Sequence, residues 1–131
     1  SIIDYYKKKN IKNYVFEFDK NILNLILSSD LAITRCGASA TAELVHTLTP
    51  FIAVPLHNSI DNHQYLNAKF YEGKGCCWIL DQNNFTKENL FNLIIEKIKN
   101  KKELENIREN MKKIYTNNVY SIIETQIKEI I

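Results

Sequence analysis

Two stretches in the middle of the chain carry residue types that bind polar ligands. The first reads Arg-Cys-Gly-Ala-Ser-Ala-Thr-Ala-Glu over residues 35–43, after a short apolar run. Gly37 lets the backbone approach a ligand closely. The N–H groups of Ala38, Ser39 and Ala40 then point out of the start of a predicted helix, which carries partial positive charge and suits a phosphate. The first stretch therefore predicts an anion site.

Glu43 adds a carboxylate to the same predicted helix. Ser39 and Glu43 are four residues apart, so both lie on one face of the helix near its start. A carboxylate in this place accepts two hydrogen bonds from a vicinal diol such as that of a ribose. The alternative interpretation is that Glu43 only adds a favourable negative charge near the helix start.

The second stretch reads Asp-Asn-His-Gln-Tyr-Leu-Asn-Ala over residues 61–68. It concentrates amide and imidazole groups at the start of another predicted helix. Amides donate and accept hydrogen bonds without carrying charge, which suits sugar hydroxyls. The alternative is that Asn62 caps the helix and that His63, Gln64 and Asn67 only face solvent.

The sequence contains no pattern typical of nucleophilic or metal-dependent catalysis. No order of serine, histidine and aspartate, no pair of carboxylates at catalytic spacing and no nucleophile elbow is present. The histidines and cysteines do not follow C-x-x-C or H-x-x-x-H spacing, which disfavours a metal site. We therefore expect a binding site without catalytic residues, metal ligands or a cofactor.

Composition narrows the class of protein further. A chain of 131 residues with 45% hydrophobic residues is long enough for one domain with a core. The net charge of +2 is spread along the chain, so nucleic acid is not an expected partner. Three cysteines without a signal peptide indicate a reduced, cytoplasmic setting. No apolar run reaches the 18 or so residues of a membrane-spanning helix, so any membrane contact is expected to be peripheral.

Strands and helices alternate in the predicted secondary structure. Apolar and β-branched runs predict strands, and apolar residues at helical spacing predict helices. Asp19, either Asp61 or Asn62, and Thr86 are the expected N-caps, and Ser39 is expected to open its helix. The predicted helices are 1–9, 19–29, 39–47, 62–72, 86–98, 102–114 and 118–130, and the predicted strands are 14–18, 31–34, 51–54 and 76–80.

This alternation predicts a parallel α/β sheet with right-handed crossovers. The continuous apolar run of residues 51–54 is typical of a strand buried on both faces. In an open sheet of this class, ligands bind at the carboxyl ends of the strands. The two polar stretches follow the strands 31–34 and 51–54, so we expect them to lie at the same edge of the sheet.

The combined motifs resemble the C-terminal, donor-binding domain of the MurG family. Residues 35–44, the prolines at positions 50 and 55, and residues 61–68 follow the family's order and spacing, and the resemblance covers residues 1 to about 115. It implies a Rossmann-like sheet flanked by helices, the C-terminal half of a GT-B glycosyltransferase. Residues 1–131 are then one partial domain that ends in the helices of residues 102–131, with at least one strand missing upstream.

The resemblance also assigns roles to individual residues. The backbone around Phe18 and Asp19 meets the uracil, the helix start from Gly37 faces the diphosphate, and Glu43 holds the ribose. His63 and Gln64 reach the N-acetylglucosamine ring, and Asn67 supports their loop. The implied donor-binding residues are Phe18, Asp19, Arg35, Gly37, Ala38, Ser39, Glu43, His63, Gln64 and Asn67.

The activity implied by the resemblance is the inverting transfer of N-acetylglucosamine from UDP-N-acetylglucosamine to lipid I. The product is lipid II, a precursor of peptidoglycan. No metal is expected for donor binding. Lipid I, the general base and peripheral contact with the cytoplasmic face of the inner membrane are expected from an N-terminal domain outside this sequence.

Two other interpretations remain open. The chain resembles in part the donor-binding subunit of a split glycosyltransferase, although residues 65–68 favour the MurG family. A non-catalytic remnant that binds nucleotide sugars is the second alternative. Its motivation is Ala40, which stands where the family commonly has a threonine, together with the strand expected upstream.

Overall fold

The computed structural model describes residues 1–56, 62–116 and 119–130. Three strands form one parallel sheet in the order β1, β2, β3. In register, Ala32 lies opposite Phe51, and Phe51 lies opposite Cys77. The predicted parallel α/β arrangement is therefore confirmed, with β1 at Ala32–Thr34, β2 at Phe51–Ala53 and β3 at Cys77–Ile79.

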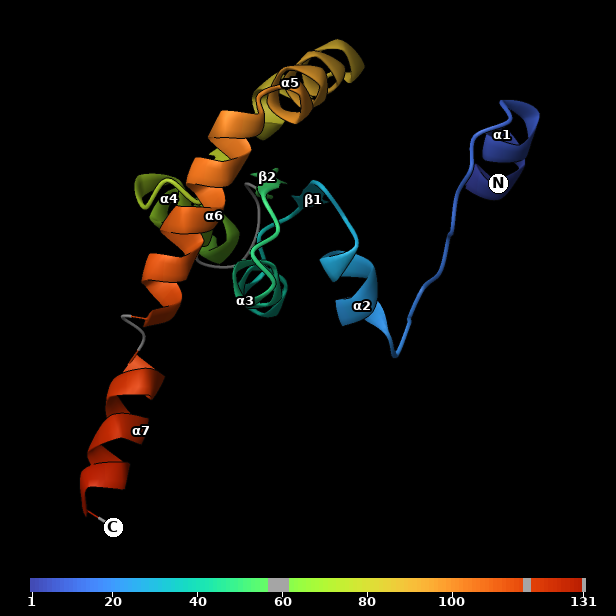
Figure 1. Cartoon of the computed structure of the whole chain (residues 1–131). Helices are drawn as coiled ribbons and strands as arrows, with labels where there is room; N and C mark the ends of the chain where they lie inside the picture. Colours follow the sequence, from blue (N-terminus) through green and yellow to red (C-terminus); the bar gives the residue numbers. More distant parts are fainter. Residues whose placement is uncertain (57–61, 117–118, 131) are drawn as a thin grey trace.

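Helices connect and flank these strands (Figure 1). Their bounds agree with the sequence-based expectations to within a few residues, the usual uncertainty at helix ends. The start expected for the last helix, residue 118, lies outside the described residues. The α-helices are α1 Ile2–Lys8, α2 Ile22–Leu27, α3 Ala38–His46, α4 His63–Gly73, α5 Lys87–Lys99, α6 Lys101–Thr116 and α7 Val119–Ile130, and the 3-10 helix η2 is Gln82–Asn84.

The strand expected at residues 14–18 is absent, so this prediction is wrong. The segment runs as an extended arm between α1 and α2, away from the sheet (Figure 1). Tyr14 and Phe16 stack on each other at 5.1 Å between ring centroids, and both are exposed. Aromatic and β-branched residues favour a strand only where a neighbouring strand offers hydrogen bonds and packing, and this segment has neither.

Of the expected N-caps, Thr86 is confirmed and Asp19 is not. Thr86 caps α5 as predicted, because its Oγ1 accepts a hydrogen bond from the N–H of Asn89 at 3.1 Å. Asp19 does not cap α2, which begins three residues later behind Asn21. The Asp19 carboxylate instead accepts hydrogen bonds from the N–H of Asn21 at 2.7 Å and the hydroxyl of Tyr14 at 2.7 Å. It therefore shapes the turn that precedes the helix.

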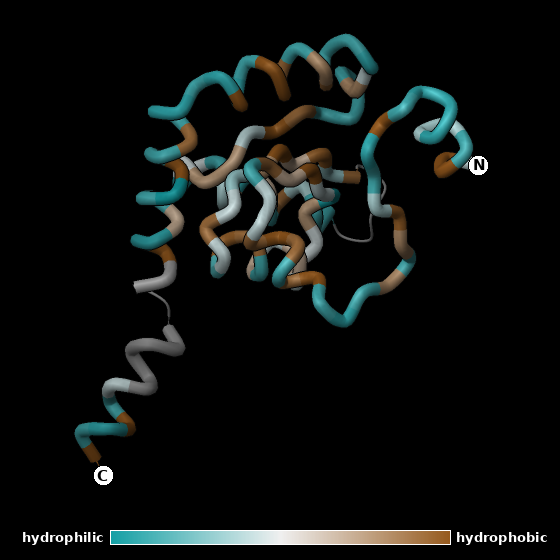
Figure 2. The backbone as a smooth tube through the Cα atoms, turned by 45° about the vertical axis from the view of Figure 1, so that its right-hand side comes forward, coloured by the Kyte–Doolittle hydropathy of each residue, from teal (hydrophilic) through white to brown (hydrophobic). Residues whose placement is uncertain are grey.

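The core lies on both faces of β2, whose residues are fully buried as predicted. Phe51 and Ala53 pack in one cluster and Ile52 in another, because alternate residues of a strand point to opposite faces. Helices α3, α4 and α6 cover the first face, and α5 covers the second. Figure 2 shows the hydrophobic colour gathered around the sheet and the hydrophilic colour along the outer sides of the flanking helices.

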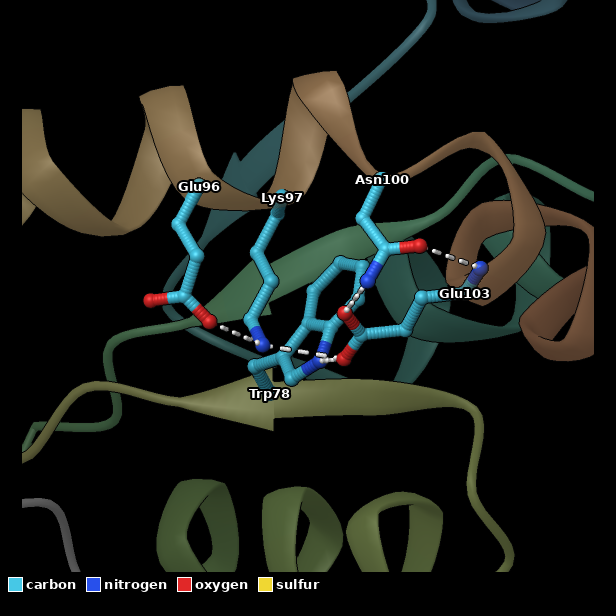
Figure 3. Close-up of polar contacts among 5 residues, drawn as sticks. All are labelled: Trp78, Glu96, Lys97, Asn100 and Glu103. Carbon is cyan, nitrogen blue, oxygen red and sulfur yellow. Dashed lines mark hydrogen bonds and ion pairs between the residues drawn. The ribbon is translucent and has the colours of Figure 1, made fainter.

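A polar network around Trp78 fastens α5 and α6 to β3 (Figure 3). The indole Nε1 of Trp78 donates to Oε1 of Glu103 at 2.7 Å, and Nζ of Lys97 donates to the same oxygen at 2.9 Å. Lys97 also lies over the Trp78 ring, at 5.2 Å from the centroid, and pairs with Glu96. The hydrogen bonds from Lys97 and then Trp78 outweigh burial and hold the pKa of Glu103 below its usual value.

None of the helices in the described part of the chain is long and apolar enough to cross a membrane. The terminal helix α7 leaves Ile127 and Ile130 exposed.

The Glu103 network predicts a pH-dependent stability. Because the folded pKa is lowered, the stabilisation is present above the unfolded value of 4.5 and is lost as the pH falls through the folded value. We expect Glu103→Gln to lower the free energy of unfolding by about 1–2 kcal/mol at pH 7, with the difference shrinking below pH 4.5. Urea titrations at pH 7 and at a pH below 4.5 measure the free energy of unfolding of both proteins.

The matched control is Glu109→Gln on the exposed side of α6, where the carboxylate pairs with Lys112. Surface pairs contribute little, so this change should cost less than about 0.5 kcal/mol at either pH. Equal effects of the two substitutions at pH 7 would contradict a special role for the Trp78 network.

Candidate functional site

The loop after β1 turns sharply at Cys36, which has a φ of +69° although it is not a glycine. Its N–H donates to Oγ1 of Thr34 at 3.1 Å, which holds the turn from the strand side. Arg35 donates to the carbonyl of Val54 at 3.3 Å and so links the ends of β1 and β2. A left-handed conformation is costly for a side chain with a Cβ, so these bonds are needed to maintain it.

Helix α3 begins directly after this turn, with Gly37 at the N-cap in place of the expected Ser39. Gly37 has a φ of −64°, and a Cβ added there would meet nothing within 4 Å. Neither backbone conformation nor packing within the described structure therefore requires a glycine. Without an N-cap side chain, the first N–H groups of the helix stay open to a ligand, and the side chains of Ala38 and Ser39 are exposed.

Helix α4 begins at His63, after Asn62 in a left-handed conformation with a φ of +58°. Asn62 occupies the N-cap position, as expected, although its side chain makes no capping hydrogen bond. Asp61, the other expected cap, lies outside the described residues, as do residues 57–60. Oε1 of Gln64 accepts a hydrogen bond from the N–H of Leu56 at 2.9 Å, which ties the first turn of α4 to the segment after β2.

The two helix starts share one open groove of about 620 Å³. Five of the residues expected at the site line it, and they come from both polar stretches of the sequence. Residues widely separated along the chain meet because the strands before them are parallel neighbours and end at the same edge of the sheet. The lining residues are Cys36, Gly37, Ala38, His63, Gln64, Leu66, Asn67 and Phe70.

Three of these lining residues were not expected from the sequence. Leu66 and Phe70 are more than half exposed and form an apolar wall, and Cys36 is fully buried. Spacing contained the signal for the first two, since residues 63, 66, 67 and 70 recur at three and four positions along one helix face. Cys36 gave no such signal, because its burial depends on the tertiary fold.

The remaining expected residues lie outside the groove lining. Ser39 is exposed in the first turn of α3, and Arg35 is engaged with Val54. Phe18 is 80% exposed on the arm before α2, and Asp19 lies next to it. Glu43 lines a second hollow of about 390 Å³, together with Leu23, Ala42, Val45, His46, Tyr71 and Ile114.

The electrostatics of the groove favour binding over covalent chemistry. Burial raises the pKa of the Cys36 thiol to about 11, so it is protonated at neutral pH and is a poor nucleophile. Burial likewise raises the pKa of Cys76 to about 11. Among the described residues, no group of three histidine, cysteine or acidic side chains could hold a metal ion. What the groove offers is N–H donors, an imidazole, amides and an apolar wall.

Comparisons with known proteins point to one family. Residues 2–126 match the glycosyltransferase family 28 C-terminal domain. A UDP-N-acetylglucosamine--N-acetylmuramyl-(pentapeptide) pyrophosphoryl-undecaprenol N-acetylglucosamine transferase of Pelagibacter ubique is 40% identical over 126 residues, covering 96% of this chain and 35% of the relative. The transferase of the same name from Rickettsia massiliae is 42% identical over 112 residues, covering 86% of this chain and 30% of the relative.

A solved structure shows the same similarity at the level of the fold. The crystal structure of Acinetobacter baumannii MurG superposes with a TM-score of 0.67 at 27% identity. The match covers 79% of this chain and 30% of that chain. The chain thus spans about a third of the length of the curated relatives that it matches.

The open backbone at Gly37 predicts an effect on ligand binding without a matching effect on stability. Gly37→Ala places a methyl group at the open start of α3, where the sequence predicts an anion site, so UDP used as a diphosphate probe should bind at least about tenfold more weakly. The free energy of unfolding should change by less than about 1 kcal/mol, since the φ suits alanine. Titration calorimetry and urea unfolding measure the two effects.

Gly75→Ala is the control, and its expected effects are the reverse of those of Gly37→Ala. Gly75 has a φ of +69°, and a Cβ there would lie 2.6 Å from Nδ2 of Asn110. This substitution should lower the free energy of unfolding by more than about 1 kcal/mol and leave UDP affinity unchanged. If Gly37→Ala behaves like Gly75→Ala, Gly37 has a structural role and not a ligand-facing one.

Proposed function

The chain belongs to the glycosyltransferase family 28 C-terminal domain family, and from this premise we propose that it is the donor-binding part of an inverting N-acetylglucosaminyltransferase. Its fold is the one expected, the C-terminal half of a GT-B glycosyltransferase. In the proposed reaction, N-acetylglucosamine moves from UDP-N-acetylglucosamine to lipid I and forms lipid II. Residues 1–131 contribute one donor-binding domain, or part of one, to this enzyme.

The observation that carries the proposal is the shared groove. The start of α3 offers N–H donors and the positive end of a helix dipole, and the start of α4 offers an imidazole and an amide. A nucleotide sugar needs this combination, because its diphosphate is charged and its sugar is neutral and rich in hydroxyls. A volume of about 620 Å³ is of the size typical of ligand sites.

The donor's parts would be distributed along these elements. The diphosphate lies at Gly37 and the first turn of α3, within reach of the Ser39 hydroxyl. The sugar lies against His63 and Gln64. Because Oε1 of Gln64 already accepts from Leu56, its NH2 group is the part that donates to the carbonyl oxygen of the sugar's N-acetyl group.

The nucleoside would extend past the groove toward the other expected residues. Glu43 lies one helical turn beyond Ser39 and holds the ribose hydroxyls. Phe18 and Asp19 lie on an exposed arm, and their backbone meets the uracil when the arm lies against the nucleotide. With the arm against the nucleotide, it would lie next to α2 and to the second hollow, which Glu43 and Leu23 line.

The proposed chemistry of this chain is leaving-group stabilisation. Lipid I attacks the anomeric carbon directly, and the bond to the β-phosphate breaks with inversion. The N–H groups of α3 are already oriented toward the place where negative charge develops on the diphosphate, so they stabilise the transition state without reorganisation. The general base that takes the acceptor's proton comes from outside this chain.

The acceptor and the membrane belong to the other half of the proposed enzyme. An N-terminal acceptor domain would bind lipid I and make peripheral contact with the cytoplasmic face of the inner membrane. The donor-binding part described here would act on the cytoplasmic side, where its soluble donor is found.

A second candidate function is donor binding without transfer, as a subunit of a split transferase or as a remnant. The observation that favours it is Ala40, which has no hydroxyl to offer the phosphates. Because the proposed general base lies outside this chain, transfer assays with lipid I and UDP-N-acetylglucosamine have to use the intact protein, and transfer there would favour the main proposal.

The sugar half of the proposed site predicts donor selectivity. UDP-N-acetylglucosamine should bind more tightly than UDP-glucose by at least about fivefold, equivalent to about 1 kcal/mol for one added hydrogen bond. Gln64→Leu should reduce this preference, because it removes the amide donor. Calorimetric titration with both donors measures it, and equal affinities in the unsubstituted protein would contradict the proposed donor.

The ribose assignment predicts a loss of nucleotide affinity on truncation of Glu43. Glu43→Ala should weaken UDP binding by about 1–3 kcal/mol, the contribution of hydrogen bonds to a charged group. Glu105→Ala on α6, which removes a carboxylate paired with Arg108, is the control and should leave binding unchanged. UDP affinity that is unaltered in Glu43→Ala would remove this residue from the site.

A further inference from the structure

A buried hydroxyl lies directly beneath the start of α3. Thr41 is 0% exposed, and its Oγ1 donates to the carbonyls of Gly37 at 2.9 Å and Ala38 at 3.1 Å. The same oxygen accepts a hydrogen bond from Nδ2 of Asn67 on α4 at 2.8 Å. Thr41 therefore joins the first turn of one site helix to the side of the other, although it lines neither hollow.

Asn67 extends this link to the strained turn before α3. Its Nδ2 also donates to the carbonyl of Cys36 at 2.9 Å, so both protons of one amide group are used. Cys36 is thereby held at its N–H by Thr34 and at its carbonyl by Asn67. We refer to Thr41, Asn67 and Cys36 as the relay.

The relay connects the two groups of residues that face the groove. Gly37 and Ala38, whose carbonyls accept from Thr41, are also the residues at the start of α3. Asn67 lies three and four positions after Gln64 and His63, on the same face of α4. A shift of one helix start therefore strains the bonds that hold the other.

We propose that Thr41 is a positioning residue that couples the phosphate-facing start of α3 to the sugar-facing start of α4, so that the two halves of a nucleotide-sugar donor bind cooperatively. This rests on the proposed donor-binding function and assigns Thr41 a role within it. Thr41 acts through the backbone of Gly37 and Ala38 and through Asn67, and it does not touch the donor.

Thr47 provides a matched comparison at the other end of the same helix. Its Oγ1 donates to the carbonyls of Glu43 at 2.9 Å and Leu44 at 3.1 Å, in the same three- and four-residue pattern. Its further side-chain contact is Oγ1 of Thr49 at 2.9 Å, away from α4. Thr47 thus repeats the local bonds of Thr41 without the link to α4.

The test compares Thr41→Val, Thr41→Ser and Thr47→Val in titrations with UDP-N-acetylglucosamine and UDP. Thr41→Val keeps the side-chain shape and removes the hydroxyl, so UDP-N-acetylglucosamine should bind about tenfold more weakly, equivalent to about 1.4 kcal/mol. The loss for UDP should be smaller, because UDP occupies only one half of the site. Thr41→Ser should restore affinity, and Thr47→Val should leave it unchanged.

A second readout follows the relay without any ligand. The rate at which a maleimide labels Cys36, measured site by site by mass spectrometry, reports opening of the buried turn. It should rise in Thr41→Val and not in Thr47→Val. If Thr41→Val does not fold, Asn67→Ala replaces it, with Asn110→Ala as its control, since Asn110 donates to the carbonyl of Gly75 at 3.0 Å.

The outcomes separate this inference from the proposed function. If the unsubstituted protein binds neither ligand, the proposed function fails and the inference fails with it. If it binds UDP-N-acetylglucosamine and Thr41→Val binds equally well, only the inference is overturned. Equal losses in Thr41→Val and Thr47→Val, or equal losses for UDP-N-acetylglucosamine and UDP, would also overturn it.

Discussion

The structure depends on the burial of β2 on both of its faces. Phe51, Ile52 and Ala53 are inaccessible to solvent, and such a strand is stable only with a parallel neighbour on each side and helices above and below. Each parallel connection then has to cross back over the sheet, which places α3 and α4 one after the other. Their starts consequently lie at one edge of the sheet, where the groove is found.

The groove uses backbone groups where many binding sites use charged side chains. Gly37 leaves the first turn of α3 open, and the turn at Cys36 orients that helix. Two side-chain amides hold neighbouring segments in place by hydrogen bonds. Gln64 holds the segment after β2, and Asn67 holds the turn after β1. An arrangement of this kind supplies fixed dipoles at low cost in reorganisation, which suits a charged leaving group.

The similarity to a solved structure concerns the backbone more than the side chains. An identity of 27% accompanies a TM-score of 0.67 with the Acinetobacter baumannii protein, so the fold is retained while most side chains differ. Trp78, Lys97 and Glu103 maintain part of this fold from the far side of β3.

Local patterns in the sequence determined the elements and their order. The apolar run at residues 51–54, the helical spacing in α5 and the cap at Thr86 depend on neighbours within a few positions, and they agree with the structure. The expected strand at residues 14–18 and the cap at Asp19 failed, because each depends on contacts that periodicity does not report.

The same distinction applies to the residues of the candidate site. The sequence alone identified both polar stretches and five of the residues that line the groove, which are Gly37, Ala38, His63, Gln64 and Asn67. Only the tertiary structure brought Asn67 to Cys36 and Thr41, placed Glu43 in a second hollow, and added Leu66 and Phe70 as an apolar wall. The physical reason is that these contacts join positions far apart in the chain, and the packing of α3 and α4 on β2 decides which of them meet.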